Sequence, residues 1–223
     1  MRSFYSSGVI RTALTVVVLG GLLAGCGSPP SSHSSSGSNG EIRPSGAKVS
    51  NLPIGFPNNP DNRLGPDLAP APYTAEQIRR DCPAGRKNTF GMISRRGTFV
   101  SVQQFVSVDA QGAQIKSVLA KVYQDNTGTK GSEIDPEEVT ESRFTWAELQ
   151  SHASYPAKDT TIAQERIQVR AGSYDCWRYE VREGATLSKY WFPREIAGPP
   201  VKSEVFRGDE LLISVELTEL QMP

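Results

Sequence analysis

The side chains that could do chemistry in this chain are few. Of 223 residues, three are cysteines and two are histidines. They are Cys26, Cys82, Cys176, His33 and His152. The sequence contains no G-x-S-x-G, H-E-x-x-H, Walker or Rossmann glycine pattern. It therefore predicts no catalytic residue and no bound cofactor, and we expect a protein that is not an enzyme.

Cys82 and Cys176 are far apart in the chain but could form a disulfide in an exported protein. Closing a loop of about 95 residues would stabilise the fold by roughly 4–5 kcal/mol. We expect this disulfide. Two buried reduced thiols are one alternative. A zinc site that includes His152 is another, although the C-x-x-C and H-x-x-x-H spacings of zinc sites are missing.

Five aromatic residues could line a cavity for a hydrophobic ligand, or could equally form an ordinary core. They are Trp146, Trp177, Tyr179, Tyr190 and Trp191. Each combines a large apolar surface with a polar group that needs a partner when buried.

Residues 1–25 have the parts of a secretory signal: a basic start, an apolar stretch of about 12 residues and small residues before the cut. That stretch is too short to span a bilayer, which takes roughly 20 residues. The tetrad Leu23-Ala24-Gly25-Cys26 resembles the lipobox of bacterial lipoproteins. The resemblance implies cleavage between Gly25 and Cys26 and fatty acyl chains such as palmitate on the cysteine, which anchor the protein to a membrane. An ordinary cleaved signal is the alternative.

Gly27 follows the predicted lipidated cysteine. In lipoproteins of bacteria with two membranes, an aspartate at this place commonly retains the protein at the inner membrane. We therefore expect the outer membrane, facing the periplasm or the surface, with the inner membrane as the alternative.

Residues 26–72 are predicted to form a disordered tether. Residues 31–40 are almost all serine and glycine, and prolines recur from Pro44 to Pro72. Such a segment cannot bury enough apolar surface to offset the entropy lost on ordering. It would hold a domain away from the membrane.

Residues 73–223 are long enough for one globular domain. Once the signal is removed, the chain keeps 22 basic residues against 24 acidic ones. This balance gives no argument for a nucleic-acid partner.

Three sequence signals predict short helices. Thr74 with Gln77, and Thr145 with Glu148, form capping boxes that open helices to about Asp81 and Ala153. The third signal is Asp135-Pro136-Glu137-Glu138, with a capping residue, a proline at the first position and acids in the first turn. A helix start also explains the local acidic residues better than a calcium site, whose loop needs alternating oxygens and a glycine. These residues are Glu133, Asp135, Glu137, Glu138 and Glu141.

Strand patterns occupy most of the remaining domain. They cover residues 98–108, 115–123, 165–169, 174–181, 186–192, 201–206 and 211–220. In the last stretch Leu211, Ile213, Val215 and Leu217 alternate with polar residues, as in a strand with one buried face. We predict a mainly β (α+β) fold, a single curved antiparallel sheet or half-barrel of about eight or nine strands with two or three short helices. A two-sheet β-sandwich is the alternative.

The stretch from Arg166 to Leu217 resembles the LolA/LolB-like group of bacterial envelope proteins. The resemblance is carried by Ala171 to Tyr179, by Tyr190-Trp191-Phe192, and by Gly198 to Lys202. It implies a strongly curved antiparallel half-barrel covered by helices. Characterised members of that group hold the acyl chains of lipoproteins on the concave face. No functional residue of the group can be placed on this sequence.

Together these patterns predict a membrane-anchored lipoprotein of the bacterial cell envelope whose domain binds a hydrophobic ligand, such as an acyl chain. The alternative is a non-enzymatic structural or interaction lipoprotein that docks an envelope protein. It would do so through an exposed apolar patch around Trp191 to Pro200.

Overall fold

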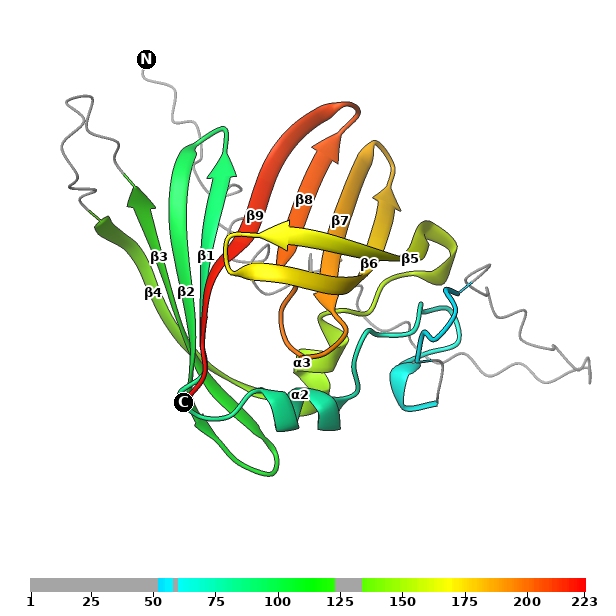
Figure 1. The fold of residues 1–223 in the computed structure, drawn as a ribbon, viewed down its shortest axis with the longest axis horizontal. Helices are drawn as coiled ribbons and strands as arrows, with labels where there is room; N and C mark the ends of the chain where they lie inside the picture. Colours follow the sequence, from blue (N-terminus) through cyan, green and yellow to red (C-terminus); the bar gives the residue numbers. More distant parts are fainter. Residues whose placement is uncertain (1–51, 58–59, 123–133) are drawn as a thin grey trace, which may run out of the picture.

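The computed structural model describes residues 52–57, 60–122 and 134–223 (Figure 1). Within these residues nine strands form one antiparallel sheet in the order β4-β3-β2-β1-β9-β8-β7-β6-β5. The strands are β1 (Lys87–Ser94), β2 (Gly97–Val108), β3 (Gly112–Val122), β4 (Ile134–Thr145), β5 (Thr160–Val169), β6 (Gly172–Glu183), β7 (Thr186–Pro193), β8 (Lys202–Arg207) and β9 (Glu210–Gln221). The sheet is open, with β4 and β5 as its edges. The predicted single antiparallel sheet is confirmed, and the two-sheet sandwich is wrong.

Strands that follow one another in the chain are neighbours in the sheet, except between β4 and β5. The pairing of β1 with β9 joins the two halves of the chain. Antiparallel neighbours need only short connections. Arg95-Arg96 links β1 to β2, and Arg170-Ala171 links β5 to β6.

Among the described residues two α-helices pack near one end of the sheet. They are α2 (Ala75–Asp81) and α3 (Trp146–Ser151), and the 3-10 helices are η1 (Pro60–Asn62) and η2 (Ala157–Asp159). Both predicted capping boxes are present, because Thr74 Oγ1 accepts from Gln77 N at 3.2 Å and Thr145 Oγ1 from Glu148 N at 3.1 Å. The Ala75 N–H donates to Gln150 Oε1 at 3.2 Å and so joins α2 to α3.

The helix start predicted at Asp135-Pro136-Glu137-Glu138 is wrong, because these residues belong to β4. β4 pairs with β3 from Val122↔Ile134 to Gly112↔Thr145. An edge strand tolerates a proline, because its missing N–H can face away from the sheet. Pairing with β3 has outweighed a local capping pattern, as tertiary context does. Glu133 lies outside the described residues.

β1 is absent from the predicted strands. Its buried face carries Asn88, Phe90 and Met92, so a polar residue interrupts the apolar alternation. All eight residues of β1 pair with β2, from Lys87↔Gln104 to Ser94↔Gly97. Pairing with the long strands β2 and β9 therefore holds β1 in the sheet, although its own sequence has only a weak strand pattern.

The core has two parts. The helix-side cluster lies where α2, α3 and part of residues 52–73 pack on the sheet. It includes Phe56, Ile78, Phe105, Trp146, Trp177, Tyr179 and Phe192. The hairpin-side cluster includes Phe90, Met92, Phe99, Val169, Cys176, Trp191 and Val215.

The β5–β6 hairpin helps to enclose the second cluster. In Figure 1 the hairpin crosses in front of β7 and β8 and its turn reaches β9. The Ala171 N–H in that turn donates to the Leu217 carbonyl on β9 at 3.1 Å. Val169, next to the turn, is buried with Val215 and Leu217.

Residues 52–57 and 60–72, assigned above to the tether, pack on the domain. Asn62 is 0% exposed and its Nδ2 donates to the Ala71 carbonyl at 2.9 Å. The Ala69 N–H donates to the Tyr155 carbonyl at 2.8 Å, and Tyr179 Oη donates to the Pro70 carbonyl at 2.7 Å. The folded part therefore begins ahead of Tyr73. The predicted signal, Cys26 and the rest of the tether lie outside the described residues.

In the part of the chain that the structure describes, no helix is long and apolar enough to cross a membrane.

Candidate functional site

An apolar pocket lies between the two helices and the sheet. Its walls include Ile78 of α2, Phe105 and Ile115 of β2 and β3, Leu149 of α3 and Phe192 of β7. Gly198, Pro199 and Pro200 of the β7–β8 loop close another side. The cavity volume is about 70 Å³, counted as the space that the centre of a water molecule can reach. One water needs about 10–15 Å³ on this measure, so the pocket holds a group of several water volumes, such as a short acyl chain.

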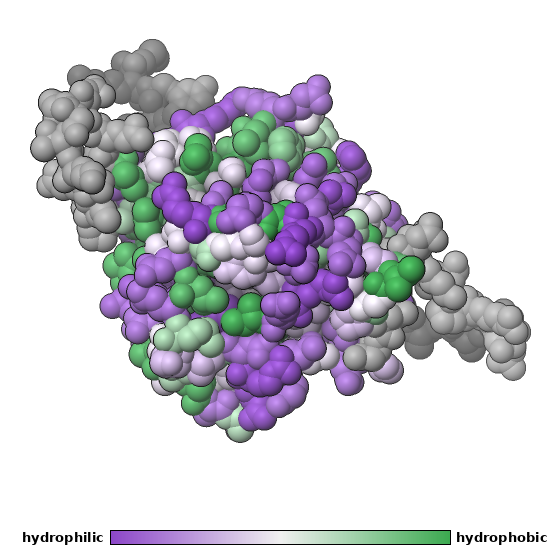
Figure 2. All heavy atoms as spheres, viewed as in Figure 1, coloured by the Kyte–Doolittle hydropathy of each residue, from purple (hydrophilic) through white to green (hydrophobic). Residues whose placement is uncertain are grey.

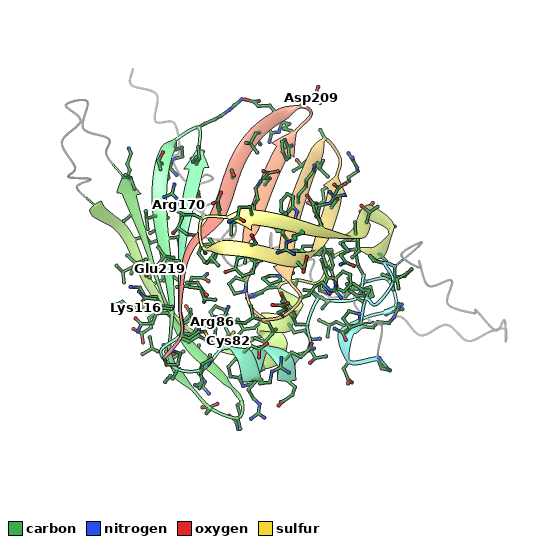
Figure 3. All side chains as sticks on the ribbon, viewed as in Figure 1. Cys82, Arg86, Lys116, Arg170, Asp209 and Glu219 are labelled. Atoms are coloured by element: carbon green, nitrogen blue, oxygen red, sulfur yellow. The ribbon has the colours of Figure 1, made fainter. Side chains whose placement is uncertain are left out.

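Arg86, just ahead of β1, is a buried cation beside this pocket. It is 3% exposed. Its Nη1 donates to the Asp81 carbonyl at 2.7 Å, to the Ala197 carbonyl at 2.6 Å and to Cys82 Sγ at 3.2 Å. Figure 3 places Arg86 and Cys82 close together near the end of α2. These bonds fix the guanidinium between α2 and the β7–β8 loop.

Asn88 follows Arg86 on the same buried face. It is 1% exposed, and its Oδ1 accepts the Arg86 Nε–H at 3.2 Å. Arginine only donates hydrogen bonds, so the amide oxygen has to face it. Asn88 Nδ2 is therefore left buried, with no partner among the described residues. Asn88 pairs across the β1–β2 ladder with Gln103, which lines the pocket.

Cys82 and Cys176 are free thiols in this structure, so the predicted disulfide is not formed. The two side chains belong to different parts of the core and contact different groups. Cys82 Sγ lies 3.7 Å from the Ala197 carbonyl, and Cys176 Sγ lies 3.7 Å from the Tyr174 carbonyl. Burial raises the pKa of Cys82 to about 11 and that of Cys176 to about 12, so both thiols stay protonated at neutral pH.

His152 lies at the C-terminal end of α3 and lines the pocket. Its ring packs edge-on against Phe144, with 5.6 Å between the ring centroids. Burial lowers the pKa of His152, and the nearby Glu148 carboxylate only partly offsets this. Within the described residues no group of three His, Cys, Asp or Glu side chains could hold a metal ion, and so the zinc alternative has no site there.

The five aromatic residues predicted as ligand contacts are all in the core, but none of them lines the apolar pocket. Trp146 Nε1 donates to the Asp109 carbonyl at 3.0 Å, and Tyr179 is 0% exposed. Tyr190 stacks on Tyr155 with 5.2 Å between centroids. These three side chains, with Trp177, pack in or against the helix-side cluster.

Trp191 and Trp177 lie away from the pocket. Trp191 belongs to the hairpin-side cluster, and its Nε1 donates to Glu165 Oε2 at 3.1 Å. Trp177 lines a wider groove of about 410 Å³ with Asp175, Arg194 and Glu195. Arg194 stacks on the Trp177 ring at 4.5 Å, so the groove is polar and charged rather than suited to an acyl chain.

The apolar patch predicted around Trp191 to Pro200 is not exposed, since Trp191 and Ala197 are buried. Large apolar side chains are exposed elsewhere, including Ile93 at 64% and Val139 at 58%. Figure 2 shows a mostly hydrophilic face on which hydrophobic residues gather in small separate groups. Of the predicted acidic run, Glu138 and Glu141 are exposed on β4.

The sequence analysis assigns no role to Arg86 and Asn88, two buried polar residues that lie next to residues of the pocket wall. The sequence predicts only that a helix ends shortly before them, at about Asp81. The one signal available was the pattern Arg86-x-Asn88-x-Phe90, in which two polar residues share a strand face with apolar ones. A buried arginine is rare enough that this pattern would more often indicate a solvated face.

No family model matches this chain, and no curated protein matches it either. Membership of the LolA/LolB-like group therefore remains a prediction. Among solved structures, the chain is similar to a Bacteroides fragilis protein described as exported and as having a YmcC-like fold, at 11% identity and a TM-score of 0.36. That match covers 62% of this chain and 96% of the other. The chain is also similar to MucB, solved in complex with MucA(peri), at 10% identity and a TM-score of 0.43 over 66% of this chain and 55% of the other. At this level of similarity neither match carries a conclusion about function.

Proposed function

We propose that this protein is a lipid-anchored lipoprotein of the bacterial envelope that binds a small hydrophobic ligand between its sheet and the helices α2 and α3. The observation that carries the proposal is the apolar pocket, whose walls come from both helices, three strands and the β7–β8 loop. The proposed role is binding, without catalysis.

The anchor rests on the start of the sequence. The apolar stretch ends at Leu23-Ala24-Gly25-Cys26, where a lipobox would place cleavage and the lipid. An exported domain tethered this way works at the membrane surface, where apolar ligands are concentrated.

The size of the pocket limits the ligand. Pockets for drug-sized molecules are roughly 300–1,000 Å³, so a space of about 70 Å³ suits one short acyl segment rather than several long chains. Leu149 of the short helix α3 covers part of this space, together with His152 and Ala153 of the turn that follows the helix. Longer chains would need α2 or α3 to move away from the sheet.

Native mass spectrometry of the lipid-free chain tests this role. The chain from Cys26 onward would carry Cys26→Ser and be purified gently from a bacterial periplasm. We expect a fraction with added mass that extraction identifies as an acyl compound, and Ala153→Trp, which fills the pocket, should abolish it. Ala147→Trp, on the exposed side of α3, is the matched control and should keep the added mass. A bare mass for all three chains would refute the proposal.

Docking of an envelope protein is a second candidate, favoured by an apolar row across the sheet. Val139, Val118 and Val102 lie directly opposite one another on β4, β3 and β2, so they share one face. Val139 is exposed and the other two are half-buried. A photo-crosslinking residue at Val139 should then capture a defined envelope partner, whereas one at exposed Lys158 should not. Equal labelling at both positions would count against docking.

A further inference from the structure

We infer that the pocket binds its ligand through a carboxylate: the ligand is a short-chain acid whose acyl group lies between α2 and the sheet and whose head group meets Arg86 and Asn88. This inference rests on the proposed function and names the ligand class for the same pocket.

Arg86 is a buried positive charge. A buried charge is costly unless a counter-charge compensates it. Arg86 makes no ion pair within the described residues, and its bonds go to carbonyls, a thiol and an amide. The Asp81 carboxylate is already bound to Arg80 at 2.6 Å and to the Ala197 N–H at 2.8 Å. The pocket therefore has a cation at its side whose direct counter-ion is missing.

Arg86 and Asn88 each keep a hydrogen-bond donor without an acceptor among the described residues. Arg86 uses Nη1 and Nε for its bonds, and Nη2 donates to no atom of the described residues. Nε and Nη2 form one edge of the guanidinium, so Nη2 lies on the side of Asn88. Asn88 Nδ2 is also without a partner. Neighbouring donors with no acceptor select an anion, and a carboxylate can accept from Arg86 Nη2 with one oxygen and from Asn88 Nδ2 with the other.

These two donors lie next to residues of the pocket wall. A β-carbon added to Gly198 would lie 2.6 Å from Arg86 Nη2, so the free end of the guanidinium faces this glycine. Gly198 and Cys82, which both touch Arg86, line the pocket. The register partner of Asn88, Gln103, lines it as well. Arg86 and Asn88 thus lie directly behind residues that line the pocket, whose wall is apolar apart from Gln103 and His152.

Isothermal titration calorimetry with hexanoate, hexanol and hexylammonium tests the inference on the chain from Cys26 onward carrying Cys26→Ser. We expect hexanoate to bind at least tenfold more tightly than hexanol, and hexylammonium not to bind. Asn88→Asp fills the donor site with an internal carboxylate, and should reduce hexanoate affinity at least tenfold. Arg86→Met should do the same. Arg207→Met removes an exposed cation instead and should leave hexanoate affinity unchanged.

The outcomes separate the two proposals. Hexanol binding as tightly as hexanoate overturns the carboxylate site but leaves the apolar pocket as a ligand site. A lack of binding by both compounds refutes the pocket itself. Tight hexanoate binding that Asn88→Asp does not weaken, with near-ultraviolet circular dichroism showing a folded variant, overturns the assignment to Arg86 and Asn88. If Arg86→Met does not fold, the folded Asn88→Asp variant decides the result.

Discussion

The Arg86 Nε–H donates to Asn88 Oδ1 at 3.2 Å, and this single bond leaves the opposite end of the amide, Nδ2, buried and unpaired. The Arg86 guanidinium and the Asn88 NH₂ group both only donate hydrogen bonds, and this bond places them in the same part of the core. Buried polar groups are normally satisfied, so an unpaired one calls for an explanation such as a functional role, a bound water or an ion. A carboxylate bound by both groups, as proposed above, would tie the stability of this fold to the occupant of its pocket.

Asn88→Asp is expected to stabilise the ligand-free protein. The substitution replaces the unpaired Nδ2 with an oxygen that can accept from Arg86, so the free energy of unfolding at pH 7 should rise by about 1–3 kcal/mol. Urea unfolding measures this. Gln104→Glu adds the same charge at an exposed position of β2 and should change stability by less than about 0.5 kcal/mol.

The gain from Asn88→Asp should depend on pH. Arg86 would hold the pKa of the new carboxyl below its unfolded value of about 3.9. The added stability is then fully present above that value, and is lost as the pH falls through the lower folded pKa. Destabilisation at pH 7 would show that the guanidinium does not need a counter-ion.

Gly198→Ala should destabilise the protein more than Gly208→Ala. Both glycines have positive φ, +152° and +58°, so each substitution carries backbone strain of about 1–3 kcal/mol. At Gly208 an added β-carbon meets nothing within 4 Å, whereas at Gly198 it meets the guanidinium of Arg86. Thermal unfolding of the two variants compares the losses. Equal losses would mean that Arg86 moves aside without cost.

Cys82 and Cys176 should react as free thiols only after unfolding. Both are 0% exposed, and burial holds their pKa values at about 11 and 12. The thiolate is the reactive form, so maleimide should add to neither cysteine in the folded chain and to both in guanidinium chloride. Intact mass measures the additions. An unfolded chain that takes up maleimide only after reduction would instead restore the disulfide predicted from the sequence.

His152 should make stability fall as the pH drops below neutrality. Burial lowers its pKa below the ordinary value of 6.5, so the folded state favours the neutral ring. Its contribution is present above 6.5 and is lost as the pH falls through the lower folded pKa. Urea midpoints at pH 7.5 and pH 5 should differ more for the wild type than for His152→Gln. The same difference in both chains would contradict this account of His152.

The predictable parts of the fold were those with strong local patterns. The capping residues Thr74 and Thr145 located both helices, and alternating apolar residues located β2, β3 and the strands from β5 to β9. β4 was missed because pairing with β3 overrides the capping signal at Asp135-Pro136. β1 was missed because Asn88 interrupts its apolar face.

The pocket could not be predicted because it depends on tertiary packing. Its walls come from segments as distant as Ile78 and Pro200, and no local pattern brings them together. The aromatic residues proposed from composition are instead core, where Tyr179 contacts Phe192 and Tyr155. The partners of the Arg86 nitrogens are likewise set by tertiary packing, since they come from α2, Cys82, Asn88 and the β7–β8 loop.

The most direct test of the central claim is a crystal structure of the chain grown with bromohexanoate, a short acid whose bromine is located by anomalous scattering. The account predicts the bromine between α2, α3 and the sheet, near Phe105 and Leu149, with the carboxylate beside Arg86 Nη2 and Asn88 Nδ2. Bromine in the groove beside Trp177, on the valine row of β2 to β4, or nowhere on the ordered protein would contradict it.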